Sequence, residues 1–158
     1  MGLELTELLK EKEKILVGIG REWKNRTEGC AALLKLLEGK DFFIITSNDD
    51  GTVISSGLDR EKITWPNAES GEYENWESYM NWIQGTLNRE LLVLELGENY
   101  SNPALMRWPF EKTVYINQKA VLVRVNAKYA QIPEEIHGKA FSVPENSVDF
   151  IVAAAQLC

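Results

Sequence analysis

The chain has 158 residues, of which 44% are hydrophobic and 26% are charged, values typical of one globular domain with a substantial core. Its 17 basic and 24 acidic residues give a formal net charge of -7, and the basic residues are scattered, which argues against a nucleic-acid-binding face. No apolar stretch is long enough to cross a bilayer, and the charged, amphipathic amino terminus is unlike a signal peptide. We therefore expect a cytoplasmic protein without a membrane segment.

Cysteine and histidine are too scarce for a metal centre of the usual kind. The sequence holds two cysteines, Cys30 and Cys158, and one histidine, His137, whereas a structural zinc site usually takes four such ligands. Cys30 falls on the apolar face of a predicted helix, where a free cysteine is usually a small core residue. We expect His137 to lie in a surface loop without a catalytic role.

The first half of the chain predicts helices and strands in alternation. In order, the elements are an amphipathic helix at 3–12, a strand at 14–20, a helix from about 25 to 39, a strand at 42–45 and a short strand at 62–65. The run 42–45 is continuously apolar, which is typical of a strand covered on both faces, and we place it in the middle of a parallel sheet. Gly39 supplies the helix stop, and Pro66 ends the short strand.

The second half continues the alternation after a polar loop. In order, the elements expected are a helix at 76–87, a strand at 90–97, a second helix, a strand at 120–126, an edge strand at 140–141 and a last helix. The aromatic stripe of the first helix is expected to pack in the core. Ser101 or Asn102 is expected to cap the second helix, which should kink or restart at Pro109. Ser142 and Glu145 form a predicted capping box for the last helix.

Strands that alternate with helices predict an α/β fold, here a single three-layer Rossmann-like domain over residues 1–158 with a mostly parallel sheet of five to six strands. The strong strands end in glycine, asparagine or aspartate, and such ends meet at one edge of a parallel sheet, where ligands bind. The candidate ligand-binding residues at these ends are Gly18, Gly20, Thr46, Asn48, Asp50, Gly51, Gly97, Ser101, Asn102 and Asn126. Glycines let phosphates approach backbone amides, and amide or carboxylate side chains suit ribose hydroxyls. The pattern favours a nucleotide pocket; the alternative is a sheet whose loops are simply polar and rich in glycine.

The spaced set Thr46-x-Asn48-x-Asp50-Gly51, after an apolar strand and a Gly-x-Gly strand end, resembles the sirtuin family. Residues 91–126 are similar to the sirtuin stretch that runs from a strand–glycine turn to an Ile-Asn motif, with Asn126 as its asparagine. The likeness is closest to bacterial sirtuins associated with macrodomain proteins. It implies a Rossmann-type domain that binds NAD, with cofactor-lining positions at Gly18, Gly20, Asn48, Asp50, Gly97 and Asn126. By the same resemblance, Asn48 and Asp50 would lie near the ribose and nicotinamide and Asn126 on the adenosine side.

The chain also departs from the sirtuin pattern. The catalytic histidine of the family should follow the third strand, where this chain has Trp65-Pro66-Asn67, and the four-cysteine zinc module is missing. The nicotinamide-side loop is reduced, because Gly20 is followed at once by Arg21 and a predicted helix. These departures disfavour deacetylation and leave no residue assigned as catalytic.

Three hypotheses follow from the resemblance and its gaps. The leading one is a degenerate, catalytically inactive sirtuin-like domain that binds NAD or ADP-ribose as a sensor or interaction module. The second is an active NAD-dependent ADP-ribosyltransferase or NAD hydrolase in which Asn48 and Asp50 act without a histidine. The third is an interaction scaffold without nucleotide, in which the surface left by the missing zinc module forms a homodimer or binds a protein partner.

Overall fold

Seven strands lie side by side in the order β4-β3-β2-β1-β5-β6-β7 in the computed structural model, which describes residues 2–157. Their bounds are β1 Lys14–Ile19, β2 Asp41–Thr46, β3 Ile63–Pro66, β4 Tyr73–Glu74, β5 Leu91–Leu96, β6 Ala120–Val125 and β7 Ala140–Val143. All neighbouring pairs are parallel except β3 and β4, which form an antiparallel pair. The predicted α/β class and mostly parallel sheet are confirmed. The sheet is slightly larger than predicted, because β4 has two residues and leaves no periodic signal in the sequence.

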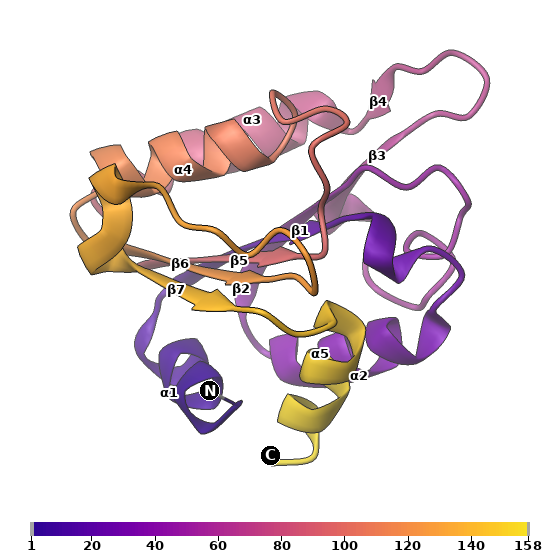
Figure 1. Cartoon of the computed structure of the whole chain (residues 1–158). Coiled ribbons are helices and arrows are strands. Elements are labelled where there is room, and N and C mark those ends of the chain that lie inside the picture. Colours follow the sequence, from indigo (N-terminus) through magenta and orange to yellow (C-terminus); the bar gives the residue numbers. More distant parts are fainter. Residues whose placement is uncertain (1, 158) are drawn as a thin grey trace.

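Helices cover both faces of this sheet, which gives the three predicted layers (Figure 1). Their bounds are α1 Gly2–Glu11, α2 Thr27–Leu37, α3 Trp76–Gln84, α4 Arg107–Ile116 and α5 Ser147–Ala155, with short 3-10 helices η1 Arg21–Trp23, η2 Arg60–Lys62 and η3 Glu134–Lys139. One hydrophobic core lies between the sheet and α1, α2 and α5, and a smaller one lies under α3 and α4. Within residues 2–157, no helix has the length and apolar character required to cross a membrane.

The central strand is β1, not β2 as predicted. It pairs in parallel with β2 on one side and with β5 on the other, while β2 lies one strand from the centre. From β1 the chain builds the sheet outward to β2 and β3, and then returns to add β5, β6 and β7 on the opposite side. The reversal places the topological switch point at the carboxyl ends of β1 and β5, where open α/β sheets bind ligands.

The aromatic stripe of α3 is only partly core, contrary to our prediction. Tyr79 is buried, but Trp76 and Met80 are 39% and 38% exposed, and Leu87 beyond the helix is 58% exposed. The helix packs against β2 and β3 near the edge of the sheet, so only one side of its apolar stripe meets a partner. The periodicity predicted the helix correctly and overestimated how much of it the sheet covers.

Two predicted helix starts are wrong. No residue from 98 to 106 is helical, so α4 begins at Arg107 rather than near Ser101 or Asn102. Pro109 lies in the first turn of α4, where its missing N–H would have had no partner, so the helix runs through Pro109 and does not restart there as predicted. The last helix is capped by Asn146, whose side chain accepts hydrogen bonds from the Val148 and Asp149 amides. Ser142 lies in β7 and donates instead to the Ala130 carbonyl.

Candidate functional site

The carboxyl ends of β1, β2, β5 and β6 meet at one edge, which we call the carboxyl edge. The parallel register pairs Ile19 with Thr46 and Leu96, and Leu96 with Val125, so the residues that follow lie at one level. The Gly20 amide donates to the Leu96 carbonyl at 2.8 Å, and the Gly97 amide donates to the Val125 carbonyl at 2.9 Å. The fold therefore brings together four of the predicted site residues, Gly20, Asn48, Gly97 and Asn126.

Two glycines allow the loops of the carboxyl edge to pack directly on one another. A Cβ atom on Gly20 would lie 2.3 Å from the Glu98 Cα atom, so only glycine lets the chain after β5 cross the end of β1. Gly97 has a φ of +74°, and a Cβ there would lie 2.6 Å from the Ser147 Oγ atom. Gly18 has a different place: it lies inside β1, where a Cβ would lie 2.5 Å from Met106 and Phe110 atoms. It serves the packing of α4 on the sheet.

Asn48 is a buried side chain with one of its two polar atoms unpaired. Its backbone amide donates to the Thr46 Oγ1 atom at 3.1 Å, and its Nδ2 atom donates to the Gly20 carbonyl at 2.7 Å. Its Oδ1 atom is buried and has no hydrogen-bond partner. Buried acceptors are rarely left unpaired, so Asn48 Oδ1 marks a position suited to a donor group of a ligand.

A small cavity of about 140 Å³ lies beside Asn48 and is also lined by Thr46, Gly51 and Trp65. The neighbouring Asp50 carboxylate is already bonded: it accepts from the Thr52 amide and hydroxyl and from the Asn25 amide. Burial acts to raise the pKa of Asp50, but these hydrogen bonds outweigh it and hold the pKa below its ordinary value. Asp50 therefore ties the loop after β2 to the start of α2.

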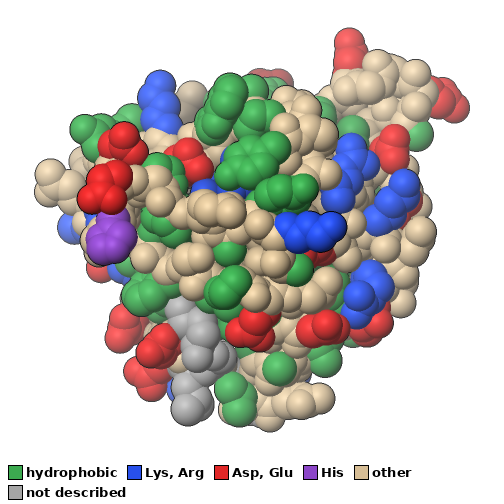
Figure 2. Space-filling view, viewed as in Figure 1, with side chains coloured by type: hydrophobic (Ala, Val, Ile, Leu, Met, Phe, Trp, Pro, Cys, Tyr) green, Lys and Arg blue, Asp and Glu red, His purple; other side chains and the backbone are tan. Residues whose placement is uncertain are grey.

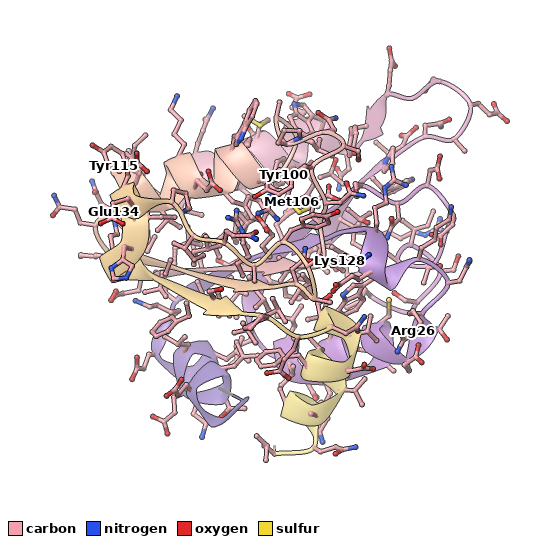
Figure 3. The ribbon with its side chains drawn as sticks, in the orientation of Figure 1. Arg26, Tyr100, Met106, Tyr115, Lys128 and Glu134 are labelled. Carbon is pink, nitrogen blue, oxygen red and sulfur yellow. The ribbon has the colours of Figure 1, made fainter. Side chains whose placement is uncertain are left out.

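A larger groove of about 430 Å³ lies on the other side of the switch point, a volume within the usual range for small-molecule sites. Its lining includes Gly97, Asn126, Arg21 and Lys128. Lys128 comes from the loop after β6 (Figure 3), and basic side chains gather on this side of the molecule (Figure 2). The exposed residues Ser101 and Asn102 do not line either cavity.

Asn126 shapes the wall of this groove from within. It is 2% exposed; its Nδ2 atom donates to the Glu98 carbonyl at 2.7 Å, and its Oδ1 atom accepts from the Lys128 and Tyr129 amides at 3.0 Å each. These bonds hold the chain after β6 against the chain after β5. Asn126 therefore positions the wall, and Lys128 is the charged side chain that it places at the groove.

Two glutamates at the carboxyl edge escaped the sequence analysis. Glu22 accepts hydrogen bonds from the Ser147 amide at 2.8 Å and hydroxyl at 2.6 Å, and from the Ala127 amide at 2.8 Å. Glu98 is 2% exposed and accepts from the Ser47 hydroxyl at 3.0 Å and from the Asn99 amide at 3.2 Å. Only the position of Glu98 directly after a strand–glycine turn could have identified it as a site residue.

Burial raises the pKa of Glu98, while its hydrogen bonds from Ser47 and Asn99 and the positive charge of Arg21 lower it; the net shift is upward. A buried carboxyl group with a raised pKa beside a ligand-sized groove, here lined by the neighbouring Gly97 and Asn99, is a candidate functional group. Among residues 2–157, no group of three or more His, Cys, Asp or Glu side chains could hold a metal ion.

A network of buried ion pairs holds the backbone at Glu98. The side chains of Glu95, Arg107 and Arg124 are fully buried, and Glu95 pairs with Arg124 at 2.7 Å and with Arg107 at 3.2 Å. Arg107 also donates to the Glu98 carbonyl at 3.1 Å and to the Tyr100 hydroxyl at 3.0 Å. Arg107 thus fixes the turn after β5 to the sheet beneath it.

The sequence matches no family model and no curated protein. The structure is similar to solved structures, of which 42 chains match. One, on the structural basis of sirtuin substrate affinity, has a TM-score of 0.63 and 14% identity, and the match covers 98% of each chain. Sir2Tm bound to a propionylated peptide has a TM-score of 0.62 and 14% identity over 98% of this chain and 97% of that one.

A third similar structure is a triple mutant of a Sir2 homologue in complex with 2'-O-acetyl ADP ribose. Its TM-score is 0.60 at 8% identity, over 99% of this chain and 96% of that one. At such low identity the likeness concerns the fold, and it agrees with the family resemblance in the sequence. The chain therefore has a sirtuin-like, SIR2-like Rossmann fold.

Proposed function

We propose that this chain binds NAD or ADP-ribose at the carboxyl edge of its sheet and does not act as a deacetylase. The observation that carries the proposal is the unpaired, buried Asn48 Oδ1 atom next to Gly20 at the switch point. An unsatisfied buried acceptor costs about 1–3 kcal/mol. A carboxamide or ribose hydroxyl that donates to this atom would recover that free energy, so the residue fits an NAD-type ligand.

The larger groove suits the adenosine diphosphate half of such a ligand. Arg21 and Lys128 line it and offer charged donors for phosphate oxygens. When bound, NAD would supply an ADP-ribosyl group joined to a nicotinamide leaving group. The solved Sir2 homologue that holds 2'-O-acetyl ADP ribose supports this choice of ligand class.

Deacetylation is not proposed, because the chain offers no histidine base at this edge. Its single histidine, His137, is exposed in η3. That helix leads into the amino end of β7, at the opposite edge of the sheet. A general base must come within hydrogen-bonding distance of the proton it removes, and His137 does not reach the crevice.

Isothermal titration calorimetry with NAD, ADP-ribose and nicotinamide tests the binding proposal. We expect NAD and ADP-ribose to bind and to raise the melting temperature. Lys128→Ala should weaken the binding of both ligands by about 5-fold, because an exposed charged contact contributes roughly 1 kcal/mol. Lys10→Ala in α1 removes the same charge away from the groove and should leave affinity unchanged. Neither heat nor a thermal shift at millimolar NAD and ADP-ribose would refute the proposal.

A role as an interaction module is favoured by exposed aromatic residues on α4. Trp108 and Tyr115 are 58% and 62% exposed, and hydrophobic side chains gather over this part of the surface (Figure 2). Exposed apolar patches often mark partner sites. Light scattering of the wild type and of Trp108→Ser tests the homodimer: a dimer that dissociates in the variant supports it, and a monomeric wild type contradicts it.

A further inference from the structure

We propose that the carboxyl edge hydrolyses NAD, with the Glu98 carboxylate as the base that activates the attacking water. This inference rests on the binding proposed above and adds a reaction to it. The second hypothesis above relied on Asn48 and Asp50; here Glu98 is the base. Three observations carry it: the position of Glu98 at the switch point, the hydrogen bonds that fix it, and the charges around it.

The position comes from a chain crossing. Glu98 follows β5, passes over Gly20 at the end of β1, and bonds to Ser47 after β2. Its carboxylate therefore lies over the central strand. The neighbours of Glu98, Gly97 and Asn99, line the larger groove, and the neighbours of Ser47 line the smaller cavity. Glu98 lines neither cavity itself, but it lies between residues that do, so a dinucleotide that occupied both would lie beside the Glu98–Ser47 hydrogen bond.

The Glu98 carboxylate is held in place through only one of its two oxygen atoms. Both of its hydrogen bonds, from Ser47 and Asn99, fall on the Oε1 atom. Its backbone carbonyl is held by Arg107 and Asn126 at 3.1 and 2.7 Å. Within residues 2–157, no hydrogen bond is formed to Oε2, which leaves this atom to accept a proton from water.

The other carboxylates of the edge lack this freedom. Asp50 and Glu22 each accept three hydrogen bonds from the protein, and Asp49 is exposed to solvent. Asn48 approaches the Gly20 carbonyl from the β2 side, so its free Oδ1 atom and Glu98 border the same strand end. Asn48 Oδ1 can orient the nicotinamide carboxamide or a ribose hydroxyl, and Glu98 would take the proton of the attacking water.

The groups around Glu98 make it a stronger base than an ordinary carboxylate. Burial raises its pKa, the hydrogen bond from Ser47 and the charge of Arg21 lower it, and the Glu95 carboxylate raises it. Burial and the charges of Glu98 and Asp49 raise the pKa of Tyr73, on β4, to about 12, although Arg21 acts to lower it. Tyr73 therefore stays a neutral phenol, and Glu98 is the acid–base group of the cluster. A carboxylate with a raised pKa is a stronger base.

The reaction balances without an oxidant or a metal. The water oxygen forms a bond to C1' of the nicotinamide-side ribose, and its proton passes to Glu98 Oε2 and then to solvent. The bond between C1' and the nicotinamide ring nitrogen breaks, and its electron pair returns to that ring. The products are ADP-ribose and nicotinamide. The negative charge of Glu98 would also stabilise the positive charge that develops at C1', as carboxylates do in glycosidic transition states.

Chromatography of nicotinamide released from NAD tests this inference, with ADP-ribose calorimetry on the same samples. Glu98→Gln should lower the rate by about 100-fold or more and leave ADP-ribose affinity within about 3-fold. Glu134→Gln, at the exposed start of η3 (Figure 3), is the matched control and should keep the wild-type rate. Glu98→Asp keeps the charge but withdraws it by one methylene, so it should retain part of the activity.

The wild-type rate should rise with pH as Glu98 loses its proton, and the residual rate of Glu98→Gln should not follow this rise. ADP-ribose binding without nicotinamide release would overturn the inference and leave the binding proposal intact. Equal rates for the wild type and for folded Glu98→Gln and Glu98→Asp variants would also overturn it. Failure of the wild type to bind ADP-ribose or NAD would refute the binding proposal itself.

Discussion

Replacement of Gly20 by alanine tests how the carboxyl edge is assembled. The new Cβ atom would lie 2.3 Å from the Glu98 Cα atom, 2.5 Å from the Glu98 amide nitrogen and 2.6 Å from the Gly97 carbonyl oxygen. All three are backbone atoms, so no side-chain rotation relieves the overlap. Overpacking of a core costs about 1–3 kcal/mol, and a shift of the main chain places this substitution at the upper end. We expect a loss of about 3 kcal/mol in the free energy of unfolding, or a melting temperature about 6–12 °C lower.

Urea denaturation followed by tryptophan fluorescence measures this loss, because Trp23 is fully buried. Gly18→Ala should cost less, about 1–2 kcal/mol, because the atoms it meets belong to the movable side chains of Met106 and Phe110. Gly138→Ala meets no atom within 4 Å and should change stability by at most about 1 kcal/mol. A Gly20→Ala variant as stable as Gly138→Ala would refute the crossing of β1 by the chain at Glu98.

Three further predictions concern buried groups. Glu95→Gln leaves two buried arginines without their shared anion and should cost about 3–5 kcal/mol in urea denaturation; a loss as small as that of the exposed Glu134→Gln would contradict the network. Because burial raises the pKa of Glu98 above its ordinary 4.5, the folded state holds the proton more tightly and stability falls as pH rises through this range. Glu98→Gln should therefore gain unfolding free energy relative to wild type near neutral pH, with the gap closing towards about pH 4; a gap independent of pH would contradict this. Cys30 is 1% exposed and burial raises its pKa, so in a Cys158→Ser variant a thiol reagent should react only as fast as the protein unfolds, and rapid labelling of the native state would show that Cys30 is accessible. Cys158 itself lies outside the described residues.

The arrangement of helices and strands could be predicted because its signals are local. A continuous apolar run such as 42–45 has the same meaning wherever it lies in the chain, and the glycine after α2 indicates its end. The errors occur where two local signals compete. Both Ser101 and Asn102 are good helix caps, but other hydrogen bonds hold the chain from 98 to 106 in a non-helical conformation. Asn99 accepts from the Ser101 amide, and Arg107 donates to the Glu98 carbonyl. Asn146, four residues after the predicted Ser142, caps α5.

Polar strand ends are visible in the sequence alone, and they identified Gly20, Asn48, Gly97 and Asn126 as residues of one edge. The part that each residue plays there depends on tertiary contacts. Asp50 accepts hydrogen bonds from Thr52 in its own loop and from Asn25 just before α2, whereas Glu98 is held by a hydrogen bond to a residue 51 positions away. The bonds between Glu22 and Ser147 span 125 positions. Contacts at such separations depend on the order and register of the strands, which no local pattern of residues encodes.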